Sequence, residues 1–435
     1  MRYQNKNVKK VLIITYYFPP SGGAGVQRWL KMMKFLPEFG IEPIVLTVDA
    51  KYASYPQYDY SMLAEIPTGV AVYRTKSREV LSLYKKVSPN KEVPYGGFAN
   101  EPQPNLFQKI ARFIRGNFFL PDPRRGWNKY AYKKACEIIQ KEGIQTVITT
   151  SPPHSTQLIG LKLKKNFPSL QWIADLRDPW VEIYYNKDLY QTKWAEKRNM
   201  KYEYSVLTQA DKIITVSEDC AKMFKRNAGP NLPIFVLPNG YDPDDFKDLE
   251  LIPNEGKKVL SYVGVFSPQY RIDVLVDALR KIAPMWADKL LLRFVGVVCE
   301  EAKEMLDDLP YEIDYIDYVS HKKAIAYMCS SDALLLCIPY IPKNKGILTG
   351  KMFEYMAAQK PIVLIGPIDG DAAYIIEKCE AGNCCGYDMY QVAHYINAAL
   401  QEKADDGDEP NDNIDYQQYS RHYTAQRLAV IVKNL

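Results

Sequence analysis

Short apolar runs alternate with helical patterns along most of this 435-residue chain, and this alternation limits the possible folds more than any other feature. Strands of a parallel sheet are covered by helices on both faces, so they read as continuous apolar runs joined by helical crossovers. The first half is therefore predicted to form a doubly wound parallel sheet. Its apolar runs lie at 11–15, 43–47, 146–150, 171–174, 212–216 and 234–237, and helical patterns such as 26–36 and 156–165 separate most of them.

A second series of runs begins after the polar, proline-bearing stretch 240–256 and predicts a second sheet, with strands at 258–264, 291–295, 313–316, 333–336 and 361–365. A chain of this length exceeds one compact core, so we expect two domains. Their predicted limits are 1–245, with an insertion at about 51–125 where periodicity is weak, and 246–415. An amphipathic helix at 416–435 is expected to cross back to the first domain.

The composition argues against several classes of protein. The net charge of +5 is too small to indicate nucleic-acid binding. The eight cysteines are scattered without a C-x-x-C pair, so neither a zinc site nor a disulfide framework is predicted. No apolar stretch approaches the roughly 18 residues that a membrane span requires, and the run at 11–14 is predicted to be a strand. We therefore expect a cytoplasmic protein whose membrane contact is peripheral, at the inner face of the plasma membrane.

The segment 106–127 is basic and aromatic. Such a segment can lie on an anionic membrane surface, as basic amphipathic helices do. It can equally be a core-facing helix with a solvated basic face, and the sequence leaves both interpretations open. Its cations, interleaved with phenylalanines, are Lys109, Arg112, Arg115, Arg124 and Arg125.

The segment 351–366 places one cation and one carboxylate on a short helix that leads into an apolar strand. Lys351 and Glu354 stand three residues apart and so share a helix face. A lysine near a helix start can bind phosphate, and a carboxylate one turn later can accept hydrogen bonds from a ribose diol. The pattern predicts a nucleotide site, although an exposed lysine–glutamate pair on an ordinary amphipathic helix has the same spacing.

Gly22, Gly23 and Gly25 lie between the first predicted strand and the first predicted helix. Glycines let a backbone approach an anion, and a helix N-terminus presents unpaired N–H groups. A phosphate or diphosphate site is predicted here, and a structural turn is the alternative. Arg28 occupies the position of the third glycine of G-x-G-x-x-G and no P-loop lysine follows, so the pattern matches neither a dinucleotide site nor a P-loop.

Arg271 ends the strand-to-helix loop that opens the second domain after Gly264. A guanidinium at this position can neutralise a leaving diphosphate. Together with Lys351 it would provide two cations from one domain, facing the glycine loop of the other. An exposed loop arginine without a role is the alternative.

Two polar segments, 149–156 and 175–180, follow strands of the first domain and are expected at the carboxyl edge of its sheet. They contribute His154, Arg177 and Asp178 as candidate residues. A structural salt-bridge cluster is the alternative for the second segment, and a single histidine in a proline-rich loop is more often structural than catalytic. The D-x-D pattern at 242–245 follows Asn-Gly in a connector, so it is predicted to be a turn and helix cap.

Taken together, these motifs resemble the retaining glycosyltransferases of family 4, of a bacterial type that acts in surface-polysaccharide assembly. The resemblance covers most of the chain and implies the α/β GT-B fold, in which two doubly wound Rossmann-like domains face a central cleft. Its matching segments are 19–28, 174–180, 236–246, 262–264 with Arg271, 319–328, 331–334 and 351–361.

The resemblance also implies roles for matching residues. Glu354 would bind the nucleotide ribose, Arg271 and Lys351 would bind the diphosphate, and Gly22, Gly23 and Gly25 would form the donor loop of the first domain. We expect catalysis to depend on Arg271, Lys351 and Asp178, and the acceptor side to contain His154, Arg177 and Asp178. No metal or other cofactor is expected, because the two cations supply the charge that a leaving diphosphate needs.

Three positions depart from the family pattern. Gly346 stands where the family has a glutamate, eight positions before Glu354, and this change affects the contacts to the donor sugar. Val265 replaces an arginine often seen after the glycine of that loop. Arg177 replaces a histidine that often precedes the aspartate, which favours an acidic or phosphate-bearing acceptor.

The sequence therefore predicts a metal-independent, hexosyltransferase-like glycosyltransferase. It would use a nucleotide sugar and a lipid-linked or oligosaccharide acceptor, with retention of configuration, in cell-surface polysaccharide biosynthesis. Two alternatives remain open: a nucleotide-sugar epimerase of the same fold, and a non-catalytic nucleotide- or glycan-binding partner of a transferase.

Overall fold

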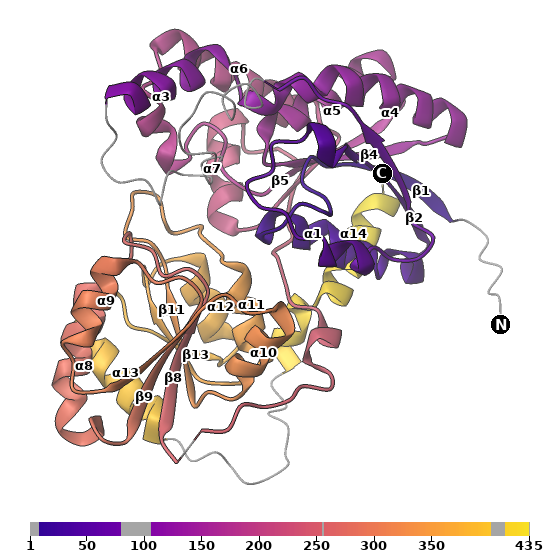
Figure 1. The fold of residues 1–435 in the computed structure, drawn as a ribbon. Coiled ribbons are helices and arrows are strands. Elements are labelled where there is room, and N and C mark those ends of the chain that lie inside the picture. The colour runs from indigo at the N-terminus through magenta and orange to yellow at the C-terminus, as the bar shows by residue number, and fades with distance from the viewer. Residues whose placement is uncertain (1–7, 80–105, 255, 402–413, 435) are drawn as a thin grey trace, which may run out of the picture. The chain divides into compact units, whose positions relative to one another are not determined.

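The computed structural model describes residues 8–79, 106–254, 256–401 and 414–434 (Figure 1). The chain divides into two compact units, Met1–Pro238 with Thr424–Leu435, and Asn239–Tyr423. Each unit contains one parallel sheet with helices on both faces. The limits 1–245, 246–415 and 416–435 stay predictions about functional domains, and the compact units are described one at a time below.

Among the described residues, the first unit has a seven-stranded parallel sheet in the order β3-β2-β1-β4-β5-β6-β7. Strand β1 pairs with β2 on one side and β4 on the other, so that Val11 lies opposite Pro43 and Thr146. The strand order therefore reverses between β1 and β4. The strands are β1 (Lys9–Ile14), β2 (Ile41–Val48), β3 (Ala71–Thr75), β4 (Thr146–Ser151), β5 (Gln171–Leu176), β6 (Lys212–Thr215) and β7 (Ile234–Val236).

Side chains of β1 alternate between two cores, as the period of a strand requires. Val11 and Ile13 pack in the cluster that contains residues of α1 and α14, whereas Leu12 and Ile14 pack in the cluster that contains residues of α4 and α5. The α-helices are α1 (Ala24–Met33), α3 (Leu106–Phe118), α4 (Asn128–Glu142), α5 (Gln157–Asn166), α6 (Lys193–Gln209), α7 (Glu218–Ala228) and α14 (Arg421–Lys433). Short 3-10 helices are η1 (Leu36–Phe39), η2 (Ala50–Tyr52), η3 (Ser61–Glu65), η4 (Pro123–Trp127), η5 (His154–Thr156) and η6 (Tyr184–Leu189).

The second unit repeats this plan. Its described strands form a six-stranded parallel sheet in the order β10-β9-β8-β11-β12-β13, which reverses between β8 and β11. The strands are β8 (Lys258–Val263), β9 (Leu290–Val295), β10 (Glu312–Ile316), β11 (Ala333–Cys337), β12 (Ile362–Ile365) and β13 (Gly382–Cys384). The helices are η7 (Pro243–Phe246), α8 (Ile272–Trp286), α9 (Glu300–Asp307), α10 (His321–Cys329), α11 (Gly350–Ala357), α12 (Asp371–Lys378), α13 (Met389–Gln401) and η8 (Ile414–Tyr419).

Local sequence signals set several helix ends. Gly143 follows α4 in the left-handed conformation, with φ of 64°, which favours glycine at this position. The Ser217 hydroxyl caps α7 by accepting a hydrogen bond from the N–H of Cys220. The Asp242 carboxylate caps η7 by accepting from the N–H of Asp244, so the prediction of a turn and helix cap at 242–245 is confirmed.

The two doubly wound parallel sheets are confirmed, and the differences lie at their edges. Strand β3 lies inside the segment 51–125, and strand β13 was also not predicted. The helix predicted at 416–434 is interrupted, because η8 ends at Tyr419 and α14 begins at Arg421. Within the described ranges, every helix is too short or too polar to cross a membrane.

Candidate functional site

Ligands of open parallel sheets bind beyond the carboxyl ends of the strands, where the strand order reverses. In the first unit this point lies between β1 and β4, which lead into the glycine loop and the segment with His154. In the second unit it lies between β8 and β11, which lead toward Arg271 and toward α11 with Lys351. The predicted residues of each unit therefore lie near the expected ligand-binding edge of its sheet.

The geometry of the glycine loop favours glycine at two positions. Gly23 is the N-cap residue of α1 and has φ of 85°, a conformation that other residues rarely adopt. A Cβ on Gly22 would lie 3.2 Å from Cγ of Gln57 and 3.3 Å from Cβ of Asp59, which is tight. The N–H of Gly22 donates to the carbonyl of Gln57 at 3.0 Å, and that of Val26 donates to the carbonyl of Gly23 at 3.2 Å. The N–H groups of Ala24 and Gly25 lie in the first turn of α1, where a helix provides no backbone partner of its own. The loop therefore has the chemistry of an anion site.

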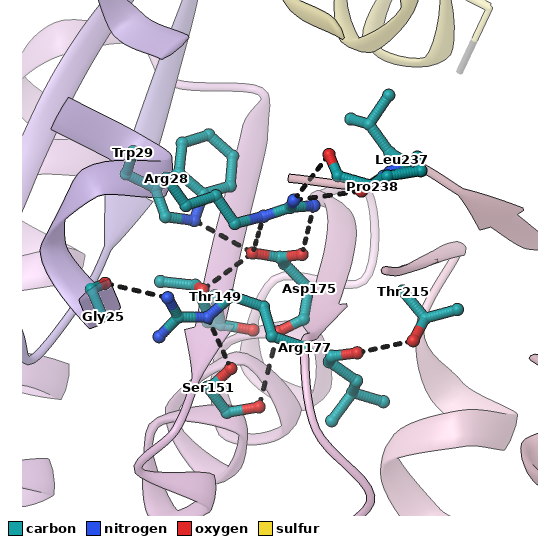
Figure 2. Close-up of polar contacts among 12 residues, drawn as sticks. Gly25, Arg28, Trp29, Thr149, Ser151, Asp175, Arg177, Thr215, Leu237 and Pro238 are labelled. Carbon is teal, nitrogen blue, oxygen red and sulfur yellow. Dashed lines mark hydrogen bonds and ion pairs between the residues drawn. The ribbon is translucent and has the colours of Figure 1, made fainter. Parts of the chain in front are cut away.

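Asp175, near the end of β5, lies at the centre of a buried network (Figure 2). Its Oδ1 accepts a hydrogen bond from Nη2 of Arg28 at 3.0 Å. Its Oδ2 accepts from Nε of Arg28 at 3.2 Å, from Nε1 of Trp29 at 2.9 Å and from Oγ1 of Thr150 at 2.7 Å. Nη1 of Arg28 donates to two backbone carbonyls that follow β7. The arginine that replaces the third glycine of the dinucleotide motif therefore ties α1 to β5.

Arg177 makes a second set of contacts beside this network (Figure 2). Its Nε donates to the carbonyl of Ser151 at 2.9 Å, and its Nη1 donates to the carbonyl of Gly25 at 2.8 Å. The side chain is buried, and it links the glycine loop to the end of β4. The segment Asp175–Asp178 is thus partly structural, as the salt-bridge alternative required, but the partner of Asp175 is Arg28. Contact between Arg177 and an acceptor stays a prediction.

His154 and Asp178 lie in surroundings that change their acidity. The His154 imidazole stacks on the Trp180 ring, with centroids 4.9 Å apart and planes 10° apart. Burial lowers the pKa of His154 to about 3, partly offset by the Pro179 backbone, so the ring is neutral near pH 7. Burial raises the pKa of Asp178, against the opposing effect of Arg177. A half-buried carboxyl of this kind can exchange a proton with a hydroxyl ligand.

Lys351, on the first turn of α11, lies against strand β8 of the same unit. Its Nζ donates a hydrogen bond to Oη of Tyr262 at 2.6 Å and lies 4.0 Å from the centroid of that ring. A Cβ on Gly264 would lie 2.8 Å from this Nζ, so the glycine leaves room for the ammonium. Burial lowers the pKa of Lys351 to about 8, opposed by Cys337 and Glu354. The cation is positioned by neutral groups and can still pair with an anion.

The start of α11 offers a second group for an anion. Thr349 is the N-cap residue, but its hydroxyl caps no backbone N–H. This buried Oγ1 has no hydrogen-bond partner in the part of the chain that the structure describes. The next residue, Gly350, has open space where a Cβ would lie. A helix N-terminus with an unused hydroxyl and an adjacent lysine fits a phosphate group.

Glu354 is held by a histidine that the prediction of site residues did not include. Its Oε1 lies 2.9 Å from Nε2 of His321, and Nδ1 of His321 lies 3.8 Å from Oδ2 of Asp245. All three side chains are partly exposed. The sequence placed His321 in a motif segment, but the pairing joins residues 33 positions apart, and no local pattern indicates it.

Arg271 is the N-cap residue of α8 and pairs with Asp273 on the same helix. Its Nε donates to Oδ1 of Asp273 at 2.8 Å, and its Nη2 donates to Oδ2 at 2.6 Å. The guanidinium also lies 5.1 Å from the centroid of Tyr340, in the loop that leads to α11. The hydrogen bonds to Asp273 raise the pKa of Arg271. The structure thus brings Arg271 against the loop that precedes Lys351.

Gly346 lies in this loop directly after two anchored residues, Asn344 and Lys345. Nδ2 of Asn344 donates to the carbonyl of Pro339 at 2.8 Å and to Oη of Tyr387 at 2.9 Å. Lys345 pairs with Asp369. Because residue 346 is glycine, this position offers no carboxylate to a donor sugar. Within the described residues, no group of three or more histidine, cysteine, aspartate or glutamate side chains is arranged to hold a metal ion.

Two family models match the chain in succession. The model described as Glycosyltransferase Family 4 matches residues 95–245, and the model described as Glycosyl transferases group 1 matches residues 257–402. A search of curated protein sequences finds no match.

Solved structures of similar architecture match nearly the whole chain. A sucrose-phosphate synthase from Thermosynechococcus elongatus is 14% identical, with a TM-score of 0.59, and the match covers 98% of each chain. A glycosyltransferase from Rickettsia africae is 15% identical, with a TM-score of 0.59 and 99% of each chain covered. Anabaena Alr3699/HepE in complex with UDP and glucose is 13% identical, with a TM-score of 0.59, covering 98% of this chain and 100% of that one. At these identities the similarity shows the fold.

Proposed function

We propose that this chain, which is a glycosyltransferase of the GT-B fold, moves a sugar from a nucleoside diphosphate sugar to a lipid-linked or oligosaccharide acceptor with retention of configuration. The observation that carries this proposal is the start of α11, where Lys351, Glu354 and the unused Thr349 hydroxyl lie together. These groups match the phosphate and ribose parts of a nucleotide.

In the proposed donor complex, the ribose hydroxyls bind Glu354 in place of His321. The diphosphate is bound by Lys351 and Arg271, and by the N–H groups at the start of α11. Tyr262 holds the Lys351 ammonium in place through the 2.6 Å hydrogen bond. Gly22, Gly23 and Gly25 are proposed to bind phosphate through the loop backbone. We infer that these cations make a metal ion unnecessary.

The proposed reaction breaks the bond between the sugar C1 and the diphosphate oxygen and forms a bond from C1 to the acceptor hydroxyl oxygen on the same face. The hydroxyl proton passes to the departing diphosphate. Lys351 and Arg271 stabilise the charge that develops on the leaving group. Electrostatic stabilisation of this kind is commonly the largest single contribution to catalysis. Exclusion of water from the site would protect the reacting C1.

On the acceptor side we propose Asp178, His154 and Arg177. The raised pKa of Asp178 suits contact with the acceptor hydroxyl, and the neutral His154 ring would provide an uncharged contact surface beside it. Since the acceptor is proposed to be lipid-linked and to enter surface polysaccharide, we propose that the protein works in the cytoplasm at the inner face of the plasma membrane.

The donor site can be tested by replacing Lys351 and Glu354 separately with alanine. Loss of a group that stabilises the leaving charge typically lowers kcat by about 10²- to 10³-fold. Glu300 and Lys303 on α9 have the same three-residue spacing, pair with each other at 3.0 Å and lie outside the proposed site, so their alanine variants serve as the control. If both α11 variants turned over donor as the unchanged protein does, the proposed donor site would be wrong.

The reaction type can be tested by product analysis. Thermal-shift measurements with UDP-, GDP- and TDP-sugars would first identify the donor, because a ligand at 100 times its Kd adds about 2.7 kcal/mol to stability. NMR of the glycoside product should then show the anomeric configuration of the donor. An epimerised donor in the absence of acceptor would favour an epimerase. Binding without turnover across an acceptor panel would favour a non-catalytic partner, which the glycine at 346 keeps open.

A further inference from the structure

Helix α3 presents an apolar stripe to solvent. Leu106, Ile110, Ile114 and Phe118 follow one another at intervals of four residues and so lie along one side of the helix. Their exposed fractions range from 42% to 75%, and Phe113 beside them is 40% exposed. Soluble proteins rarely expose a contiguous apolar surface of this kind unless it contacts a partner or a membrane.

The opposite side of α3 is fixed against its own unit. A Cβ on Gly116 would lie 2.4 Å from the carbonyl oxygen of Leu189, so this face of the helix is packed at close range. Arg112, one turn before Gly116 on the same side, is buried. At the end of the helix, Asn117 Oδ1 accepts from the N–H of Thr192 at 2.7 Å. The alternative of a core-facing helix with a solvated basic face is therefore wrong, because its apolar stripe faces outward.

Helix α6 begins beside the end of α3 and carries a basic stripe. Its N-cap residue, Thr192, is the one bonded to Asn117, and both helices lie on the same side of the first unit (Figure 1). Lys193, Lys197 and Lys201 follow at intervals of four residues and are all exposed. Trp194, next to the first of these lysines, is also exposed. Tryptophan and lysine are typical of the interface between lipid headgroups and acyl chains.

We propose that α3 and the start of α6 form a surface that lies on an anionic lipid bilayer. The apolar stripe of α3 enters the boundary between headgroups and acyl chains, and the lysine stripe of α6 pairs with headgroup phosphates. The charge pattern selects this occupant, because two copies of the chain joined through the same surface would bring two lysine stripes together. Arg112 and Arg124, which the sequence grouped with the basic segment, are buried and take no part.

This surface shares with the proposed function only the expectation that the acceptor lies in a membrane, and it can be tested without donor or acceptor. The unchanged protein should sediment with phosphatidylcholine vesicles that contain about 30% phosphatidylglycerol, a fraction chosen to give an anionic surface. Binding should fall at least tenfold in the triple variant Ile110→Ser, Phe113→Ser, Ile114→Ser. Val430→Ser, which changes an exposed apolar residue of α14, should bind as the unchanged protein does.

The triple variant Lys193→Glu, Lys197→Glu, Lys201→Glu should lose binding to the anionic vesicles, and the unchanged protein should bind pure phosphatidylcholine vesicles much less. Donor turnover with a water-soluble acceptor should be equal in the α3 variant and the unchanged protein, which separates this proposal from failure of the proposed function.

Hydrogen exchange of the unchanged protein provides a readout that needs no variant. Amides of 106–118 should become protected on addition of anionic vesicles. Absence of vesicle binding by the unchanged protein, or binding by both triple variants equal to that of the unchanged protein, would overturn the proposal. Self-association of the unchanged protein that the α3 changes abolish would assign the surface to a second copy instead.

Discussion

Two arginine–aspartate pairs, one in each unit, have the same bidentate chemistry in different surroundings. In the first unit Arg28 and Asp175 are 1% and 0% exposed, and their remaining hydrogen-bonding groups are satisfied by Trp29, Thr150 and backbone carbonyls. In the second unit Arg271 and Asp273 are 33% and 51% exposed. The first pair holds elements together, whereas the second can exchange its partner for a ligand.

The degree of burial distinguishes a structural ion pair from a functional one better than the residue types do. A buried pair that loses one partner leaves a desolvated charge, whereas a half-exposed pair loses little because water replaces the partner. Lys351 and Glu354 resemble Arg271 in this respect, since each has one principal side-chain partner in a partly exposed position. The four predictions below test this distinction, in order of decreasing effect.

The largest effect is expected for stability. Asp175→Asn leaves the Arg28 guanidinium buried without its counter-charge, and loss of one partner of a buried pair typically lowers the free energy of unfolding by about 3–5 kcal/mol. Asp273→Asn, the matched change in the exposed pair, should cost less than about 1 kcal/mol. Denaturant unfolding of the two variants measures the difference. Equal costs would show that burial does not distinguish the pairs.

The second prediction concerns donor use by the exposed pair. Arg271→Ala should lower kcat/KM for the donor by about 10- to 100-fold, since a hydrogen bond to a charged group contributes about 1.5–3 kcal/mol. The free energy of unfolding should change little. Steady-state kinetics and unfolding, measured on the same preparation, test both statements. A variant that unfolds easily but keeps its kcat/KM would assign Arg271 a structural role like that of Arg28.

The difference between the pairs also explains how much could be predicted from the sequence. The central strands were predictable because parallel strands buried on both faces form continuous apolar runs. Strand β3 was missed because Ala71–Thr75 is a half-exposed edge strand inside a segment with weak periodicity. Strand β13 has three residues and begins at a glycine.

The positions of the site residues were predictable from strand ends, but their partners were not. Arg28 and Asp175 are 147 residues apart, and they meet because β1 pairs with β4 and β4 pairs with β5. The four-residue spacing in α3 describes an inward or an outward stripe equally well. The close approach at Gly116, which decides the direction, depends on a contact with Leu189 in another segment.

The third prediction extends the comparison to pH. Burial lowers the pKa of Lys351 to about 8, so the ammonium that binds the diphosphate loses its proton as the pH rises through this value. The kcat/KM for the donor, which reports the free enzyme, should therefore fall by about tenfold between pH 7 and pH 9. Lys351→Arg keeps a charged group over this range and should flatten the profile. A profile that is unchanged by this substitution would remove Lys351 from the donor site.

The smallest effect is expected where one hydrogen bond competes with the donor. Nε2 of His321 lies 2.9 Å from Oε1 of Glu354, and the proposed ribose contact requires this hydrogen bond to break. His321→Ala should therefore lower KM for the donor by about 2- to 10-fold, which corresponds to a net hydrogen bond of about 0.5–1.5 kcal/mol. Glu354→Gln should raise KM instead, because the amide retains the shape and loses the charge. If KM rose in both variants, His321 would belong to the nucleotide site itself, and the pair would act together as a ligand instead of as an exchangeable contact.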